Sequence, residues 1–163
     1  MTGANTNTET VISNLVDLLK KGNAHASLDE ALKNIPFDLL GEKPAGLPYS
    51  IWQITEHIRI TQWDIVEFSK NAKHVSPKWP DEYWTSSIKP ASEKEWENCL
   101  EEIKKDRYSF IDLLKKAGED LYKPFTYGDG QTLLREALVL ADHNSYHTGE
   151  IIILRRLLHD WKK

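Results

Sequence analysis

Cysteine is almost absent from this sequence, since Cys99 is the only one among 163 residues. A single cysteine cannot form an intramolecular disulfide, and it leaves the six histidines without the thiolate partners of a Cys/His zinc knuckle. The sequence therefore excludes a disulfide-stabilised domain and a zinc site of the knuckle class. Cys99 is expected to pack in the interior.

Long apolar runs and an excess of positive charge are also missing. No run approaches the roughly 18 apolar residues of a membrane span, and MTGANTNTET has neither the basic opening nor the apolar core of a secretory signal. The 25 acidic residues outnumber the 21 basic ones, which gives a net charge of -4. Nucleic acid and anionic membrane surfaces are therefore not expected as partners, and a cytoplasmic location is predicted.

No alternating strand pattern competes with the helical periodicity of this chain. That periodicity predicts four long helices, at about residues 8–21, 51–70, 93–117 and 133–159. The segment VSPKWPDEYWTSSIKPAS, residues 75–92, is long and rich in proline, so it is expected to cross the molecule. We therefore predict an all-α fold, a four-helix bundle with a long crossover connection between helices 2 and 3. Residues 1–163 would form a single domain, with residues 1–7 as a disordered tail.

Two of the predicted helices depart from a simple amphipathic pattern. On the third helix, Arg107 is the only charge on a line that otherwise holds Trp96, Leu100, Ile103, Phe110 and Leu114. On the second helix, Trp52 and Trp63 lie opposite the main apolar arc, so this helix is expected to be covered on two faces. Either the long connection or a second subunit could provide the second cover, and the exposed aromatic face favours a homodimer.

The last predicted helix contains DHNSYHTGEIIILRRLL, in which His143 and His147 lie beside the apolar stripe. Residues at i and i+4 have β-carbons about 5–6 Å apart, so two imidazoles there can bind one ion at about 2.0–2.1 Å. Two ligands seldom hold a divalent ion firmly, and His57 on the second helix is the candidate for the third. A packing role for each histidine is the alternative. The other three are expected to be solvent-exposed, in loops or at a helix end: His25, His74 and His159.

Glu150 lies one turn beyond His147 on the same face of the helix. We interpret it first as a hydrogen-bond acceptor for an imidazole N–H, with a fourth ligand or a general base as alternatives. Glu56 directly precedes His57, so its side chain points about 100° away. This spacing argues against a di-iron carboxylate bundle, whose helices carry Glu-x-x-His.

Aromatic residues provide candidate contacts for a small-molecule substrate. Tyr146 could reach a pocket beside the histidines, although a contact between helices is the simpler interpretation. Trp79 and Tyr83 in the long connection, together with Trp84, could form an apolar wall at the pocket mouth. Alternatively, these aromatics only hold the connection against the bundle, which is the interpretation we favour slightly.

Taken together, WQITEHI in the second helix and YHTGEIIILRR in the last make this sequence resemble the DinB-like superfamily, also called the DinB/YfiT-like metalloenzymes. The resemblance covers nearly the whole chain. It implies a small four-helix bundle with a divalent metal held by His57, His143 and His147 and an open coordination position. It also implies a hydrolase or a transferase that uses a low-molecular-weight thiol, and frequent dimerisation. The chain departs from the family pattern at Glu150, where glutamine is common, and in LLHDW, where a glycine commonly follows the leucines.

Three neutral imidazoles leave the charge of a divalent ion uncompensated, which favours an acidified bound water or a bound thiolate. Imidazole donors suit zinc, nickel, iron or copper, and donor type alone does not choose among them. Zinc or nickel is the ion we expect, with iron as an alternative. The sequence thus predicts a metal-dependent hydrolase or a thiol S-transferase acting on a small molecule. The alternatives are a metal-binding or regulatory module without turnover and a purely structural dimerisation bundle.

Overall fold

The computed structural model describes residues 3–44 and 46–161, which are all-helical, with one isolated β-bridge and no strand in these ranges. Five α-helices follow one another along the chain: α1 (Gly3–Lys20), α2 (Leu28–Leu32), α3 (Ile51–Lys70), α4 (Glu93–Ala117) and α5 (Leu133–Leu157). Short 3-10 helices lie between them: η1 (Phe37–Gly41), η2 (Asp81–Tyr83) and η3 (Gly118–Tyr122). The described helices include none that is long and apolar enough to cross a membrane.

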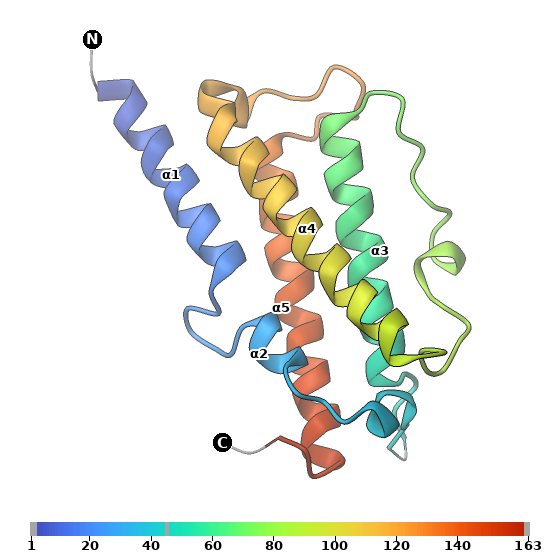
Figure 1. Ribbon diagram of the computed structural model, residues 1–163. Helices are drawn as coiled ribbons and strands as arrows, with labels where there is room; N and C mark the ends of the chain where they lie inside the picture. Colours follow the sequence, from blue (N-terminus) through green and yellow to red (C-terminus); the bar gives the residue numbers. More distant parts are fainter. Residues whose placement is uncertain (1–2, 45, 162–163) are drawn as a thin grey trace.

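The long helices pack side by side along their lengths (Figure 1). Helix α3 contacts both α4 and α5, and α1 contacts α4 and α5. Helices α3 and α4 run in the same direction, while α1 and α5 run in the opposite one (Figure 1). The chain between α3 and α4, residues 71–92, therefore returns along the length of α3 before α4 begins.

Local sequence signals explain where most helices begin and end. Ser27, Ser92 and Thr132 each precede a helix and accept a hydrogen bond from the backbone N–H three residues later, as expected for N-caps. Gly118 follows α4 with a φ of +50°, a left-handed conformation that glycine adopts without steric cost. The start of α1 differs from expectation, because the helix begins at Gly3 and therefore includes residues 3–7; residues 1 and 2 lie outside the described residues.

The second face of α3 is covered unevenly. Trp52 is 3% exposed and contacts Trp96 of α4, with ring centroids 6.3 Å apart. Trp63 is 38% exposed, and its ring contacts His74 of the chain that follows α3, with ring centroids 5.2 Å apart. The expected double cover is therefore complete at the start of this helix and partial near its end.

The apolar interior consists of two separate clusters. One includes Ile58 of α3, Ile103 of α4 and Ile151 of α5, and the other includes Ile65, Phe110 and Leu140 of the same helices. Between these clusters, each of the three helices contributes buried or half-buried polar side chains. We call this set the polar layer, and its members are His57, Gln62, Arg107, His143, Asn144, His147 and Thr148.

Candidate metal centre

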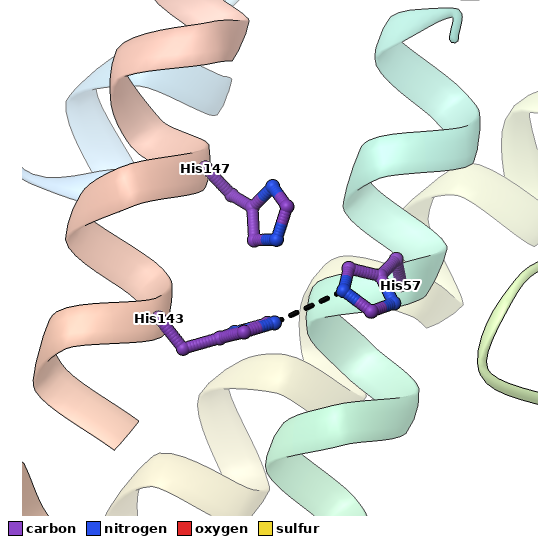
Figure 2. Close-up of side chains that lie close together, drawn as sticks. All are labelled: His57, His143 and His147. Carbon is purple, nitrogen blue, oxygen red and sulfur yellow. Dashed lines mark hydrogen bonds between the residues drawn. The ribbon is translucent and has the colours of Figure 1, made fainter. Parts of the chain in front are cut away.

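Three histidines meet at one side of the polar layer (Figure 2). His57 comes from the middle of α3, while His143 and His147 occupy successive turns of α5. The ring centroid of His57 lies 4.9 Å from that of His143 and 4.8 Å from that of His147. One ring nitrogen from each residue lies within 4.8 Å of the other two. The antiparallel packing of α3 and α5 thus brings together residues that are far apart in the sequence.

Hydrogen bonds to Nδ1 orient these rings and define their tautomers. Nδ1 of His57 donates to the backbone carbonyl of Tyr83 at 2.9 Å, and Nδ1 of His147 donates to the Glu150 carboxylate at 2.6 Å. A carbonyl or carboxylate oxygen only accepts, so the proton lies on Nδ1 and the lone pair on Nε2. The Nε2 atoms of His57 and His143 are 3.0 Å apart. In this contact His143 Nε2 donates a proton to the lone pair of His57 Nε2, and a cation bound by both rings would take the place of that proton.

Burial keeps the three imidazoles neutral at neutral pH. Loss of solvent contact lowers the pKa of His143 to about 4 and that of His147 to about 4, with the neighbouring histidines lowering them further. Burial also lowers the pKa of His57. The pKa of Glu150 is raised by its partial burial. Neutral imidazoles with free Nε2 lone pairs are the form in which histidine binds a metal ion.

The three side chains fit a divalent transition-metal ion. Ligand atoms about 2.1 Å from one ion lie at most about 4.2 Å apart, so small side-chain rotations bring the trio into range. Two of the rings already have the Nδ1 acceptors that commonly support histidine ligands. Three nitrogen donors suit zinc, nickel or iron and do not distinguish among them.

A cavity of about 280 Å³ opens beside the histidines. Aromatic rings dominate its wall, where Trp84 stacks on His57 at a centroid distance of 3.9 Å and on Tyr49 at 4.0 Å. Trp79 and Tyr146 also line it, and both are largely exposed, at 71% and 65%. No lysine or arginine is among the described residues that line this cavity. The remaining lining residues are Thr61 and Glu150.

A buried polar contact between α3 and the long connection supports His57 from behind. The hydroxyl of Tyr83 donates to Oδ2 of Asp64 at 2.6 Å, and Nε2 of His74 lies 2.7 Å from Oδ1 of the same carboxylate. Asp64 thereby fixes the turn whose Tyr83 carbonyl accepts from His57. The expectation that His74 is solvent-exposed is wrong, because its side chain is only 8% exposed against Asp64.

The structure distributes the predicted site residues over two roles. Trp79, Tyr146 and Glu150 line the cavity, whereas the Tyr83 side chain points to Asp64 and contributes its backbone carbonyl to His57. Sequence reasoning missed Tyr49 and Asp64. Tyr49 lies in a proline- and glycine-rich loop without periodicity, and Asp64 looks like any charged residue of an amphipathic helix.

A family model described as the DinB superfamily matches residues 23–151, which include all three histidines of the centre. The chain has no match among the curated proteins or the solved structures to which it was compared. The family match covers α2, α3, α4 and most of α5, so it extends over both helices that carry the histidines. Because the match covers most of the chain, this protein belongs to the DinB superfamily.

Proposed function

We propose that this protein is a metal-dependent enzyme in which His57, His143 and His147 hold one divalent ion. The observation that carries the proposal is the convergence of one ring nitrogen from each of the three histidines to within 4.8 Å, with the Nε2 atoms of His57 and His143 only 3.0 Å apart. Zinc or nickel is the proposed ion, with iron as the alternative. We also propose that the four long helices form a four-helix bundle with a crossover connection, as the sequence predicts.

A divalent ion at this position would supply a Lewis acid that lowers the pKa of a bound water or thiol. The chain's own residues prepare the site for that chemistry. Glu150 holds the His147 proton on Nδ1, and the Tyr83 carbonyl does the same for His57. Trp84 covers one face of the His57 ring and excludes water from it.

The cavity lining favours an apolar, uncharged substrate. Its wall carries four aromatic side chains and one carboxylate, with no lysine or arginine among the described lining residues, so the bound ion would be the one strong attraction for a substrate anion. Trp79 and Tyr146 at the exposed rim would contact the substrate. A second apolar pocket, lined by Leu47, Ile54 and Leu154, shares Tyr49 and Glu150 with this cavity and could accommodate an aliphatic extension.

Two reactions fit this arrangement, namely hydrolysis of a small ester or amide and transfer of a low-molecular-weight thiol. A panel of neutral aromatic esters and amides should be compared with a panel of neutral and anionic thiols. We expect turnover of neutral, apolar compounds and little with multiply charged anions, because the cavity offers aromatic surface and a carboxylate. Preference for polyanionic substrates would contradict the proposed substrate class.

Metal content is the most direct test of the proposal. Protein purified without a histidine tag is expected to contain about one zinc or nickel ion per chain by elemental analysis. His147→Ala should lose that ion, whereas His159→Ala should keep it because His159 is exposed at the end of α5. A metal-free parent protein that also fails to bind added zinc would refute the proposal.

A non-catalytic, dimerising module is the second candidate, favoured by an exposed apolar stripe on α5. Val139, Tyr146 and Ile153 recur every seven residues and are 37%, 65% and 51% exposed. The stripe lies beside the histidines, so we propose that a homodimer forms through it. Light scattering of the parent and of Ile153→Lys tests this. Metal binding without turnover on any of the panels would favour the module over the enzyme.

A further inference from the structure

Another cavity, separate from the two pockets described above, lies on the other side of α5 from the histidines. It has a volume of about 70 Å³, several times the roughly 10–15 Å³ that one water molecule needs. Its lining comes from the end of α1, the start of α2, α4 and α5. Two lysines, one arginine and a histidine line it, and the described lining residues include no acidic one: the four are Lys20, Lys21, Arg107 and His25. Lys21 also pairs with Asp17 at 3.1 Å.

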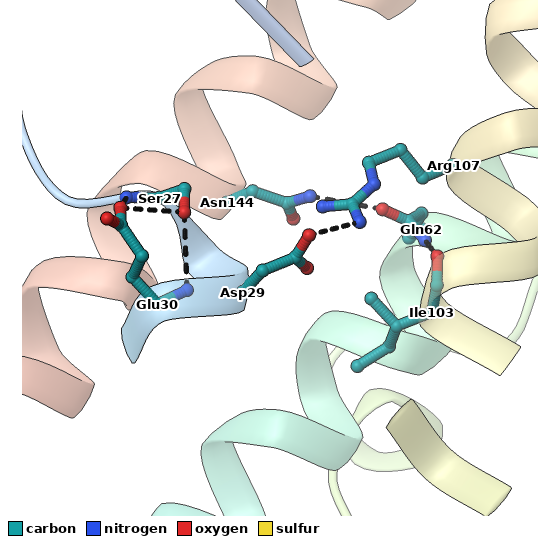
Figure 3. A network of polar contacts seen from close by, with 7 residues as sticks. All are labelled: Ser27, Asp29, Glu30, Gln62, Ile103, Arg107 and Asn144. Carbon is teal, nitrogen blue, oxygen red and sulfur yellow. Dashed lines mark hydrogen bonds and ion pairs between the residues drawn. The ribbon is translucent and has the colours of Figure 1, made fainter. Parts of the chain in front are cut away.

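Arg107 is the most buried of these basic groups, with a side chain that is 7% exposed. Its Nη2 donates to Asp29 at 2.7 Å (Figure 3), and its Nε is buried without a partner among the described residues. A guanidinium has five N–H donors, so one ion pair leaves most of them unused. Buried donors without acceptors are costly, which makes this side chain suited to an additional acceptor.

The rest of the lining combines hydroxyl groups with apolar surface. Ser27, Ser145 and Thr148 contribute the hydroxyls, while Leu19 and Leu28 contribute apolar walls. The loop after α1 is attached to α5 at the mouth of the cavity, where Ser145 Oγ lies 3.0 Å from Nε2 of His25. This combination of positive charge, hydroxyl donors and a short apolar wall matches a compact oxyanion.

We propose that this cavity is a binding site for a small oxyanion, either inorganic phosphate or a short-chain carboxylate, with Arg107 as its principal ligand. The site is independent of the metal centre, and it does not depend on the proposed enzymatic function. Asp29 competes with the bound anion, because the Asp29 carboxylate already accepts one N–H of Arg107. The Asp29 side chain is 60% exposed. The ion pair with Asp29 accounts for Nη2 and that of Lys21 with Asp17 for one lysine, but neither accounts for the unpaired Nε of Arg107 or for Lys20.

The experiment measures thermal stability and calorimetric binding of the full chain with inorganic phosphate and, separately, with butyrate. Chloride at matched ionic strength serves as the reference. A ligand that binds only the native state raises Tm with its concentration, so a saturable increase is expected for at least one anion. The tighter of the two identifies the source of the oxyanion. No saturable effect of either anion would overturn the proposal.

Variants of opposite expected sign give the sharpest test. Arg107→Gln should weaken binding of the preferred anion by about tenfold, because a charge-assisted contact is lost. Asp29→Asn should tighten it by about threefold, because an exposed competitor for the same guanidinium is removed. Arg156→Gln, which changes an exposed arginine of α5 outside the cavity, is the matched control and should leave the affinity unchanged.

Two further measurements keep the outcome decisive. The anion effect should persist in His147→Ala, because the cavity lies apart from the histidines; its loss there would assign binding to the metal centre and overturn the proposal. If Arg107→Gln does not fold, Asp29→Asn decides alone. An unchanged or weaker anion affinity in Asp29→Asn would overturn the role of Arg107.

Discussion

The two sides of the polar layer differ in the sign of the ligand they suit, although they lie across a single helix from each other. On one side, three neutral imidazoles each carry one nitrogen lone pair, which lies on Nε2 in His57 and His147. On the other, Arg107 presents N–H groups, with Asp29 as its counter-ion. Both sets are largely buried. The comparison shows that the proton content of the nitrogens, rather than burial, decides whether such a site suits a cation or an anion.

Gln62 and Asn144 connect the two sides (Figure 3). Gln62 is fully buried, donates from Nε2 to the Ile103 carbonyl at 2.5 Å and accepts from Asn144 Nδ2 at 3.1 Å. Asn144 is the sequence neighbour of His143, so this amide pair fixes α5 against α3 and α4 next to the centre. The uncharged Gln62–Asn144 pair therefore lies between the Arg107 guanidinium and the imidazoles.

The largest expected effect is on the imidazole side. His57→Ala should lower affinity for zinc by about 100-fold or more, since a lost ligand costs at least as much as a lost outer partner. Competition titration against a chromophoric chelator measures this. Arg107→Gln serves as the comparison, and its zinc affinity should stay close to that of the parent. A comparable loss in both variants would show that the two sides are not independent.

The pH dependence of the metal-free protein should give the next largest effect. His143 and His147 have a pKa of about 4 when folded, below the ordinary value of 6.5, so the unfolded chain binds more protons between these values. The free energy of unfolding is therefore highest above about pH 6.5 and decreases as the pH falls toward 4. Because both rings keep some solvent contact, we expect a decrease on the order of 2 kcal/mol.

Urea unfolding at pH 7 and pH 4.5 checks this expectation, with His143→Gln/His147→Gln as the control. The double variant lacks both titrating rings, so its stability should depend less on pH than that of the parent. Equal pH dependence in the two proteins would mean that the pKa values of these histidines are the same in the folded and the unfolded chain.

Removing the Asp64–Tyr83 hydrogen bond, which positions the acceptor of His57, should have an intermediate effect on zinc affinity. Asp64→Asn weakens the contact that holds Tyr83 and, through its carbonyl, the His57 ring. We expect zinc affinity to fall by about tenfold, as for other outer partners of metal ligands. Tyr83→Phe should have a similar effect, because it removes the same hydrogen bond from the other end. Zinc affinity unchanged in both variants would show that ring stacking on Trp84 alone orients His57.

The smallest expected effect is on stability, when the Gln62–Asn144 amide pair is broken. Gln62→Leu removes the acceptor of Asn144 and the donor to Ile103, which should lower the free energy of unfolding by about 1 kcal/mol. Chemical denaturation measures this. Zinc affinity should stay within about twofold of the parent, because Gln62 touches none of the three rings through a hydrogen bond. A large loss of zinc affinity would assign Gln62 to the centre itself.

Periodicity and capping residues predicted the α3 and α4 bounds closely, since Ser50 and Ser92 precede these helices and Gly118 follows α4. The start of α1 was not predicted, because GANTNT carries no apolar period and helix extension there leaves no signal in the sequence. The all-helical class was correct for the described residues. Helix packing depends on how apolar stripes meet in space, which spacing along one helix does not determine.

Some residues of the candidate site could likewise be predicted from the sequence, and others could not. His143 and His147 are recognisable because an i, i+4 pair needs only one helix to bring it together. The approach of His57 could be proposed from its inward position, although its distance from the pair depends on the packing of α3 against α5. The roles of Asp64 and His74 were beyond prediction, since their contact forms only when the long connection folds back on α3.

The division of the apolar interior into two clusters affects how this chain tolerates sequence change. Ile103 and Phe110 belong to different clusters, with Arg107 between them on α4. Substitutions that share no contacts combine additively in their effect on stability. Repacking one cluster is therefore expected to need no compensating change in the other. A change in the polar layer between them, by contrast, alters partners on three helices at once.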